Sequence, residues 1–152
     1  MAAAEMRREP VGASFAAGTR FSNPPTDGEL LMAGILPQPL APVDGSASAD
    51  ENRGLAAALL AYEKSQKDGA LPDAVGPLTE FLQTWPHSRW RAALYLNLGI
   101  IYRRTGHMSK ALDVWQRAWD LSKHATDSNA RAVADYSVGE LADFEAYLGR
   151  ME

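Results

Sequence analysis

Histidine and carboxylate side chains are the groups in this chain that could carry acid–base or metal chemistry. The histidines stand far apart, at the ends of predicted helices, where an imidazole is solvated or contacts C-terminal carbonyls: His87, His107 and His124. The neighbouring carboxylates Asp50 and Glu51 lie where no predicted element would bury them and raise a pKa. There is no cysteine, which excludes thiolate metal sites, thiol nucleophiles and disulfides. Nucleophile-elbow, phosphate-loop and zinc-helix motifs are also missing, so we expect no enzyme activity, metal or cofactor.

Length and composition indicate one domain with a tail. The chain has 152 residues, of which 46% are hydrophobic and 22% charged, and a net charge of −4. No apolar run is long enough to span a membrane, and the N-terminus lacks the apolar block of a signal peptide. The net negative charge gives no indication of the basic surface that nucleic-acid binding requires. We therefore expect a cytoplasmic protein.

The first third of the chain differs in amino-acid composition from the rest. Residues 1–53 hold six of the nine prolines and five glycines, which interrupt helices and sheets. We predict a flexible, disordered tail over 1–53. Within it, residues 29–36 form a short apolar stretch that either lies on the folded part or serves as a docking motif.

From residue 54 to residue 152 the apolar residues recur with helical periodicity, and no stretch alternates with the period of a strand. The predicted class is all-α. Gly69, Gly106 and Gly149 are the expected C-terminal stops, and residues 126–128 offer N-cap side chains. The predicted helices cover residues 55–67, 72–85, 88–104, 109–123 and 129–148.

Between Ala92 and Ala125 the large and small residues follow a fixed order. The order is carried by Tyr95, Leu98, Gly99, Tyr102, Gly106, Ala111, Trp115 and Ala118. This order resembles the tetratricopeptide repeat (TPR), a 34-residue helical hairpin, in its bacterial style. Lys123 departs from it, because the family usually has proline there. The resemblance implies an α–α superhelix of stacked hairpins.

The same resemblance assigns packing roles. The small residues Gly99 and Ala111 let the two helices of the hairpin cross closely, and the large residues of the first helix fill their interface. Trp115 and Ala118 are expected to pack against the following helix. Degenerate copies flank this unit: one is carried by Gly69, Ala74, Leu78, Phe81 and Pro86, the other by Leu141, Ala142 and Gly149. The last helix is either a solvated cap or the start of a further repeat.

In TPR proteins the first helices of successive repeats line a concave groove that binds a peptide or a helix. The resemblance places four residues in or beside that groove, Leu96, Asn97, Ile100 and Arg103. It implies a noncatalytic scaffold or adaptor whose partner is another protein or peptide. Residues 89–124 carry seven basic and two acidic side chains, which either favour an acidic partner, solvate the helices or attract the acidic parts of the chain. Trp85 or Trp90 is the expected exposed anchor.

Two other readings remain open. TPR-like segments also precede other domains in bacterial multidomain enzymes and surface proteins, of which this chain would be the N-terminal region. The stretch from Phe81 to Ser88 also resembles an aromatic-Pro-x-Ser link of envelope-assembly factors, although an export signal is missing. The sequence gives no indication of oligomeric state.

Overall fold

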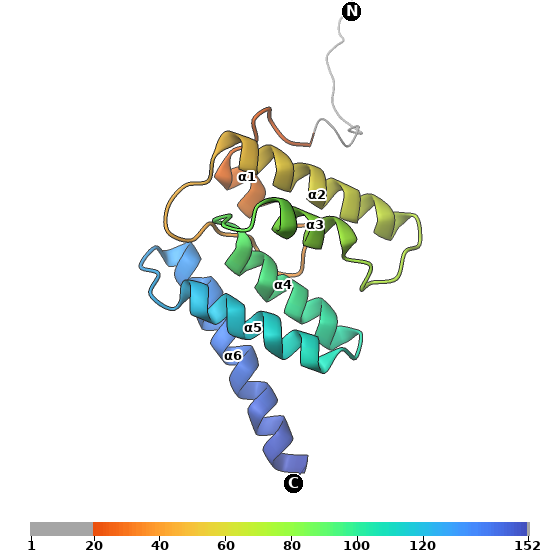
Figure 1. Cartoon of the computed structure of the whole chain (residues 1–152), viewed down its shortest axis with the longest axis vertical. Coiled ribbons are helices and arrows are strands. Elements are labelled where there is room, and N and C mark those ends of the chain that lie inside the picture. Colours follow the sequence, from red (N-terminus) through yellow and green to blue (C-terminus); the bar gives the residue numbers. More distant parts are fainter. Residues whose placement is uncertain (1–19, 152) are drawn as a thin grey trace, which may run out of the picture.

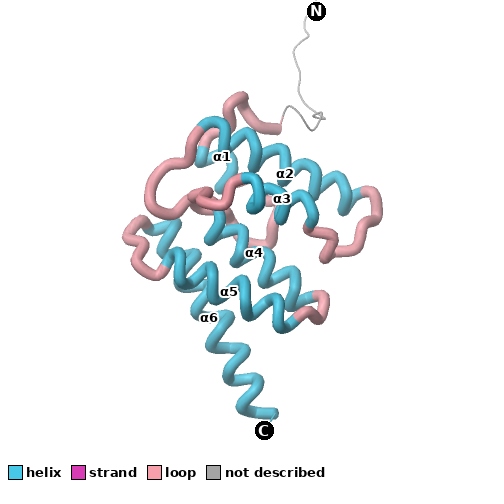
Figure 2. Tube along the Cα trace, in the orientation of Figure 1, coloured by secondary structure: helices cyan, strands magenta, loops and turns pink. Residues whose placement is uncertain are grey.

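A computed structural model describes the backbone of residues 20–151 and the side chains of residues 20–149. In this part of the chain every regular element is a helix, as the periodicity predicted (Figures 1 and 2). The part of the expected tail that precedes residue 20 lies outside the described residues. The helices are α1 (Asp27–Leu31), α2 (Ala49–Lys67), α3 (Gly76–Thr84), α4 (Arg91–Arg104), α5 (Met108–Ser122) and α6 (Ser128–Met151).

Helix ends follow local capping chemistry. Gly69 and Gly106 have φ values of +93° and +85°, as expected for glycines that follow a helix. Asp127 accepts hydrogen bonds from two N–H groups of the first turn of α6, which confirms the predicted cap. Gly149 does not end α6, which runs on to Met151.

Two capping boxes give the N-terminal region helices that the periodicity did not predict. The Ser48 hydroxyl accepts from the Glu51 N–H, the Glu51 carboxylate accepts from the Ser48 N–H, and α2 therefore begins at Ala49 rather than near Leu55. Thr26 and Glu29 form the same box at the start of α1.

The helices pack as consecutive antiparallel pairs. α2 lies on α3 and α4 lies on α5, while α6 packs on α5 and also contacts α4 (Figure 1). The start of α2 is joined to the start of α4 by polar side chains. The Trp90 indole N–H donates to the Asn52 carboxamide at 2.8 Å, and the Arg89 N–H donates to the Glu51 carboxylate at 2.8 Å.

α5 packs closely against α4 at a glycine of α4, Gly99. A Cβ atom at Gly99 would lie 2.1 Å from Nε1 of Trp115, so only glycine admits the indole at this depth. The indole N–H donates to the Leu96 carbonyl oxygen at 3.3 Å, and both Trp115 and Ala111 are fully buried. The expected close crossing is therefore present, but the large partner of Gly99 is Trp115. The indole of Trp115 lies against α4, and its packing against the following helix stays a prediction.

Residues 20–48 differ from the expected flexible tail, because they pack on the helices. Proline prevents helix and sheet but leaves an extended chain free to bury its apolar side chains. The buried apolar residues of this region are Leu30, Leu36, Leu40, Ala41 and Val43. The stretch 29–36 thus lies on the folded part, one of its two predicted alternatives.

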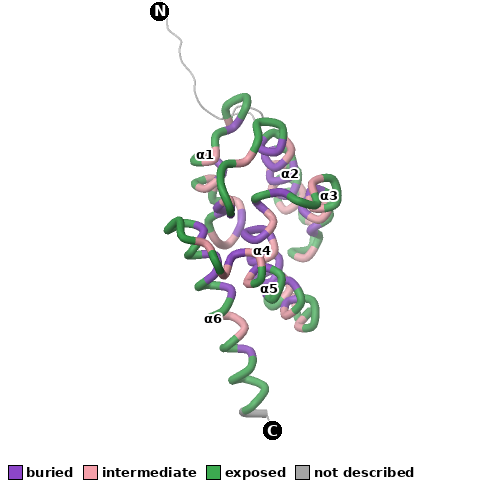
Figure 3. Tube along the Cα trace, turned by 60° about the vertical axis from the view of Figure 1, so that its left-hand side comes forward, coloured by how far each residue is buried: buried purple, intermediate pink, exposed green. Residues whose placement is uncertain are grey.

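The far end of α6 extends beyond the other helices and is largely exposed (Figure 3). Tyr147 and Leu148 are exposed there, whereas Phe144 is buried. No helix in the described part of the chain combines the length and the apolar character that crossing a membrane requires.

Candidate functional site

The four residues predicted to form a binding groove lie on α4, and three of them are covered. Leu96, Asn97 and Ile100 are 2%, 0% and 7% exposed. The side chain of Arg103 remains 46% exposed and forms an ion pair at 3.0 Å with Glu140 of α6. Another part of the chain therefore lies over this face of α4.

Residues 35–43, which we call the groove segment, run antiparallel to α4. At one end the Val43 N–H donates to the Arg89 carbonyl oxygen just before α4 at 2.9 Å. In the middle the Gln38 N–H donates to Oδ1 of Asn97 at 2.7 Å. At the other end Leu36 lines the same hollow as Ile101, near the C-terminus of α4. The segment therefore follows most of the length of the helix.

The groove segment also contacts the two helices that flank α4. Its first residues share a hollow of about 370 Å³ with Tyr62 and Gln66 of α2. The side-chain amide of Gln38 donates to the hydroxyl of Tyr136 on α6 at 3.2 Å. Helices α2, α4 and α6 thus all lie beside one non-helical piece of chain.

Asn97 is the polar residue of this site. Its Nδ2 donates to the Ala93 carbonyl oxygen at 2.9 Å, which orients the amide, and its Oδ1 accepts the Gln38 N–H. A buried carboxamide that accepts a main-chain N–H recognises an extended peptide without reading its side chains. Neither Gln38 nor the rest of the segment carries a formal charge.

A buried polar cluster anchors the chain that precedes the segment. Nδ2 of Asn52 donates to Oδ1 of Asp27 at 2.7 Å and to the Pro25 carbonyl oxygen at 3.1 Å, while its Oδ1 accepts from Trp90. Asn52 thus connects the N-terminal region, α2 and the start of α4. Because Trp90 is 0% exposed, its predicted role as an exposed anchor is wrong.

Glu51 belongs to the same cluster, contrary to the expectation that nothing would bury it. Its carboxylate accepts from the Ser88 hydroxyl and from the Arg89 N–H. Its neighbour Asp50 stays exposed, in an ion pair with Arg53 at 2.6 Å. The two carboxylates therefore have separate structural partners and do not form an acid–base pair.

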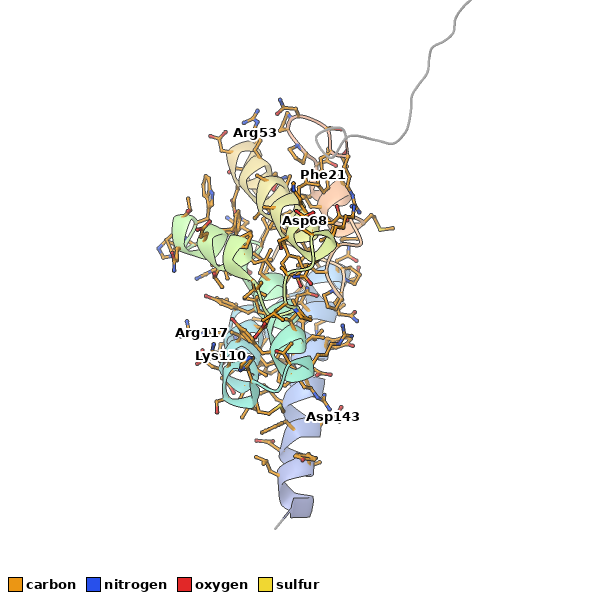
Figure 4. The ribbon with its side chains drawn as sticks, turned by 90° about the vertical axis from the view of Figure 1, so that its right-hand side faces the viewer. Phe21, Arg53, Asp68, Lys110, Arg117 and Asp143 are labelled. Carbon is orange, nitrogen blue, oxygen red and sulfur yellow. The ribbon has the colours of Figure 1, made fainter. Side chains whose placement is uncertain are left out.

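The basic residues of α4 and α5 are mostly engaged nearby. Arg117 pairs with Asp113 at 3.1 Å and lies over the Tyr95 ring, and Lys110 lies over the Tyr102 ring; both basic side chains project from α5 (Figure 4). The Asp113 carboxylate raises the pKa of Arg117 above its ordinary value. Arg103 pairs with Glu140 of α6, which is a contact of the kind expected in one of the three alternatives, attraction between the basic helices and the acidic last helix.

The histidines lie at the surface near helix ends. His107 contacts Asp73 at 2.8 Å and meets the Tyr102 ring edge-on at 6.3 Å, and His87 and His124 are exposed. Among the described residues no group of three or more potential ligands is arranged to hold a metal ion.

A second hollow lies between α2 and α3, with a volume of about 280 Å³. Gly54, Ala57 and Ala61 form one wall, and Phe81 and Trp85 form the other. Trp85 is half-buried there, which leaves part of the indole available at the surface.

No family model matches this chain, and no curated protein or solved structure is significantly similar to it. The assignment of a function therefore depends on the geometry of the chain itself.

The resemblance predicted a groove at Leu96, Asn97 and Ile100 but gave no indication that residues 35–43 would cover α4. Asn97 bonds the groove segment, and Leu96 and Ile100 are buried in the core. The segment itself has no helical or strand period. The available signals were the apolar residues spaced between its prolines and the two capping boxes before and after it.

Proposed function

We propose that this chain is a noncatalytic protein-interaction module built from TPR-like helical hairpins, which binds a partner peptide along α4. Each hairpin alone leaves one face of its helices unburied, and stacking hairpins side by side creates a continuous surface for another polypeptide. In this arrangement α2, α4 and α6 are the first helices of successive units, and together they form the binding groove.

The observation that carries the proposal is the seating of residues 35–43. A non-helical stretch of chain lies antiparallel to α4, its N–H groups donate to Asn97 and to the Arg89 carbonyl, and its neighbours are α2 and α6. A surface that accommodates its own chain in this way has the shape and the hydrogen-bonding groups to accommodate a peptide from another chain.

The chemistry of the groove favours an apolar rather than an acidic ligand. Leu96 and Ile100 belong to its apolar lining, and the cationic edge at Arg103 is already paired with Glu140. The bound segment 35–43 is uncharged. Recognition through main-chain N–H groups and apolar side chains therefore has more support than recognition of acidic side chains.

Selection of peptides on the immobilised full chain carrying Leu40→Asp tests the proposal, because this change weakens the hold of residues 35–43, which fill the groove. From a library of random 12-residue peptides, we expect enriched peptides that bind at least tenfold more weakly when Asn97→Ala is added, because the double variant lacks the oxygen that accepts the peptide N–H. Adding Asn129→Ala instead, which changes an exposed asparagine of α6, is the matched control and should leave peptide binding unchanged. Failure to enrich any peptide, or equal binding after Asn97→Ala, would contradict the proposal.

A further inference from the structure

We propose that residues 35–43 act as a tethered ligand of the groove, and that the groove accepts in trans an uncharged, proline-rich peptide of the same pattern. This inference depends on the proposed function and specifies its partner and its regulation. The partner is defined by the segment itself, whose sequence is Ile-Leu-Pro-Gln-Pro-Leu-Ala-Pro-Val.

The pattern of the segment explains what such a partner must carry. Prolines stand at positions 37, 39 and 42, and the buried side chains beside or between them are Leu36, Leu40, Ala41 and Val43. Proline fixes φ at these three positions, so less conformational entropy is lost when the peptide binds. The apolar side chains then enter the core, and the uncharged Gln38 presents its N–H to Asn97.

The segment has the attachment expected of an exchangeable ligand. Of its six residues with an N–H group, two donate to the helices among the described residues, Gln38 and Val43. The remaining attachment is apolar contact and one side-chain bond to Tyr136. By contrast, helical residues are held by a continuous ladder of main-chain hydrogen bonds.

The connection from the segment to α2 permits the segment to leave without unfolding that helix. The chain from Asp44 to Ser46 is exposed, and Asp44 and Gly45 have positive φ values of 70° and 116°, which marks a turn between the segment and α2. α2 has its own N-cap at Ser48, beyond this turn. Opening of the segment therefore does not remove the cap of the helix that follows.

Tethering determines the expected behaviour of the intact chain. A segment joined by a short connection acts at an effective concentration on the order of millimolar. A free peptide of the same sequence at micromolar concentration cannot compete with it, so the wild-type groove is closed to that peptide. A substitution that weakens the binding of the segment to the groove, without changing any residue of α4, therefore makes the groove available to the free peptide.

The test uses a fluorescent synthetic peptide of residues 33–45 and the full chain. Leu40→Asp places a charge in the buried part of the segment, between its two main-chain hydrogen bonds to the α4 region, and leaves every residue of α4 unchanged. We expect the peptide to bind this variant at least tenfold more tightly than the wild type in a fluorescence anisotropy titration. Leu71→Asp, at a leucine that is 72% exposed, is the matched control and should exclude the peptide as the wild type does.

Leu40→Ala provides a second variant in case the charge disturbs folding, and circular dichroism checks the helix content of each protein. A smaller increase in peptide affinity than with Leu40→Asp supports the inference. If both variants keep their helices and bind the peptide no better than the wild type, residues 35–43 are not a ligand of the groove and the inference is overturned. The proposed function would survive that result if library peptides of other sequences still bind Leu40→Asp in an Asn97-dependent way.

Discussion

α4 is covered on two sides by two kinds of structure. On one side α5 packs as a helix, joined by a short turn and interlocked through Gly99 and Trp115. On the other side the groove segment, residues 35–43, packs as non-helical chain, and two of its main-chain N–H groups donate to Asn97 and Arg89. Both coverings bury apolar residues, but only the first holds its own backbone together by a hydrogen-bond ladder.

This difference separates the permanent part of the fold from the part that can be exchanged. Local stability falls where main-chain hydrogen bonds to the rest of the protein are few and where apolar contact is made by short segments. The α4–α5 pair is therefore the expected stable unit, and the groove segment is the expected site of local opening. Substitutions at either contact, that of α5 with α4 or that of the groove segment with α4, should distinguish the two.

Gly99→Ala should have the largest effect on the free energy of unfolding, because it disrupts the packing of α5 against α4. The added Cβ would lie 2.1 Å from the Trp115 indole and force the two helices apart. We expect a loss of roughly 2 to 3 kcal/mol in the free energy of unfolding, measured by chemical denaturation. Gly139→Ala is the matched control, because a Cβ there meets no atom within 4 Å. It should stabilise α6 by about 0.5 to 1 kcal/mol. Equal effects of the two changes would show that the pair is not closely packed at Gly99.

Asn97→Ala acts on the contact of the groove segment with α4. It removes the acceptor of the buried Gln38 N–H and leaves that donor without a partner. We expect a loss of about 1.5 kcal/mol in the free energy of unfolding, measured in the same way. Asn129→Ala, at an exposed position, should stay within about 0.5 kcal/mol of the wild type. A neutral result for Asn97→Ala would mean that the hydrogen bond does not hold the segment.

Thr26→Ala weakens the anchor that precedes the segment. Thr26 caps α1, and loss of such a cap typically costs about 1 kcal/mol. Because that energy corresponds to a change of about fivefold in an equilibrium constant, protease cleavage within residues 20–48 should become about fivefold faster. Thr84→Ala, at the exposed last residue of α3, should leave the rate unchanged. Cleavage at the wild-type rate in Thr26→Ala would argue that α1 does not restrain the segment.

Glu29→Gln should have the smallest effect on the free energy of unfolding, and this effect should depend on pH. Hydrogen bonds from the N–H of Thr26, and then from Ser22, lower the pKa of the Glu29 carboxyl below its ordinary value. A carboxyl whose pKa is lowered in the folded state stabilises that state above its unfolded pKa, and the contribution is lost as the pH falls through the folded pKa. The stability difference between wild type and Glu29→Gln should therefore be full above about pH 5 and shrink below about pH 4.

Glu80→Gln, at an exposed glutamate of α3, is the control for that measurement. A difference for Glu29→Gln that stays constant from neutral to acidic pH would mean that the carboxylate does not take part in the capping box of α1.

Much of the helical part could be predicted from the sequence because its signals are local. The starts and ends of α4 and α5 lie within three residues of the predicted bounds, and Gly69 and Gly106 adopt the expected conformation. The pairing of Gly99 with a close neighbouring helix followed from the order of small and large residues. The identity of that neighbour, Trp115, did not follow, because a side chain at a helix surface can turn toward either adjacent helix.

The N-terminal covering could not be predicted in the same way. Its burial depends on contacts between residues far apart in the chain, such as Gln38 with Asn97 and Asn52 with Asp27. Proline content predicts the loss of regular structure but does not distinguish a solvated chain from an extended one that packs. The capping boxes at Thr26 and Ser48 were local signals, and they predict the added helix starts once they are considered.

Native-state hydrogen exchange tests the central claim most directly, because it compares the two coverings of α4 in one unmodified protein. The amides of Gln38 and Val43 report on the groove segment, and the amides of Leu98 and Trp115 report on the α4–α5 pair. The account predicts that the segment amides exchange through a local opening of lower free energy, while the helical amides exchange only near the free energy of global unfolding. Exchange of all four amides at the same free energy would contradict it, since the segment and the helices would then unfold as a single unit.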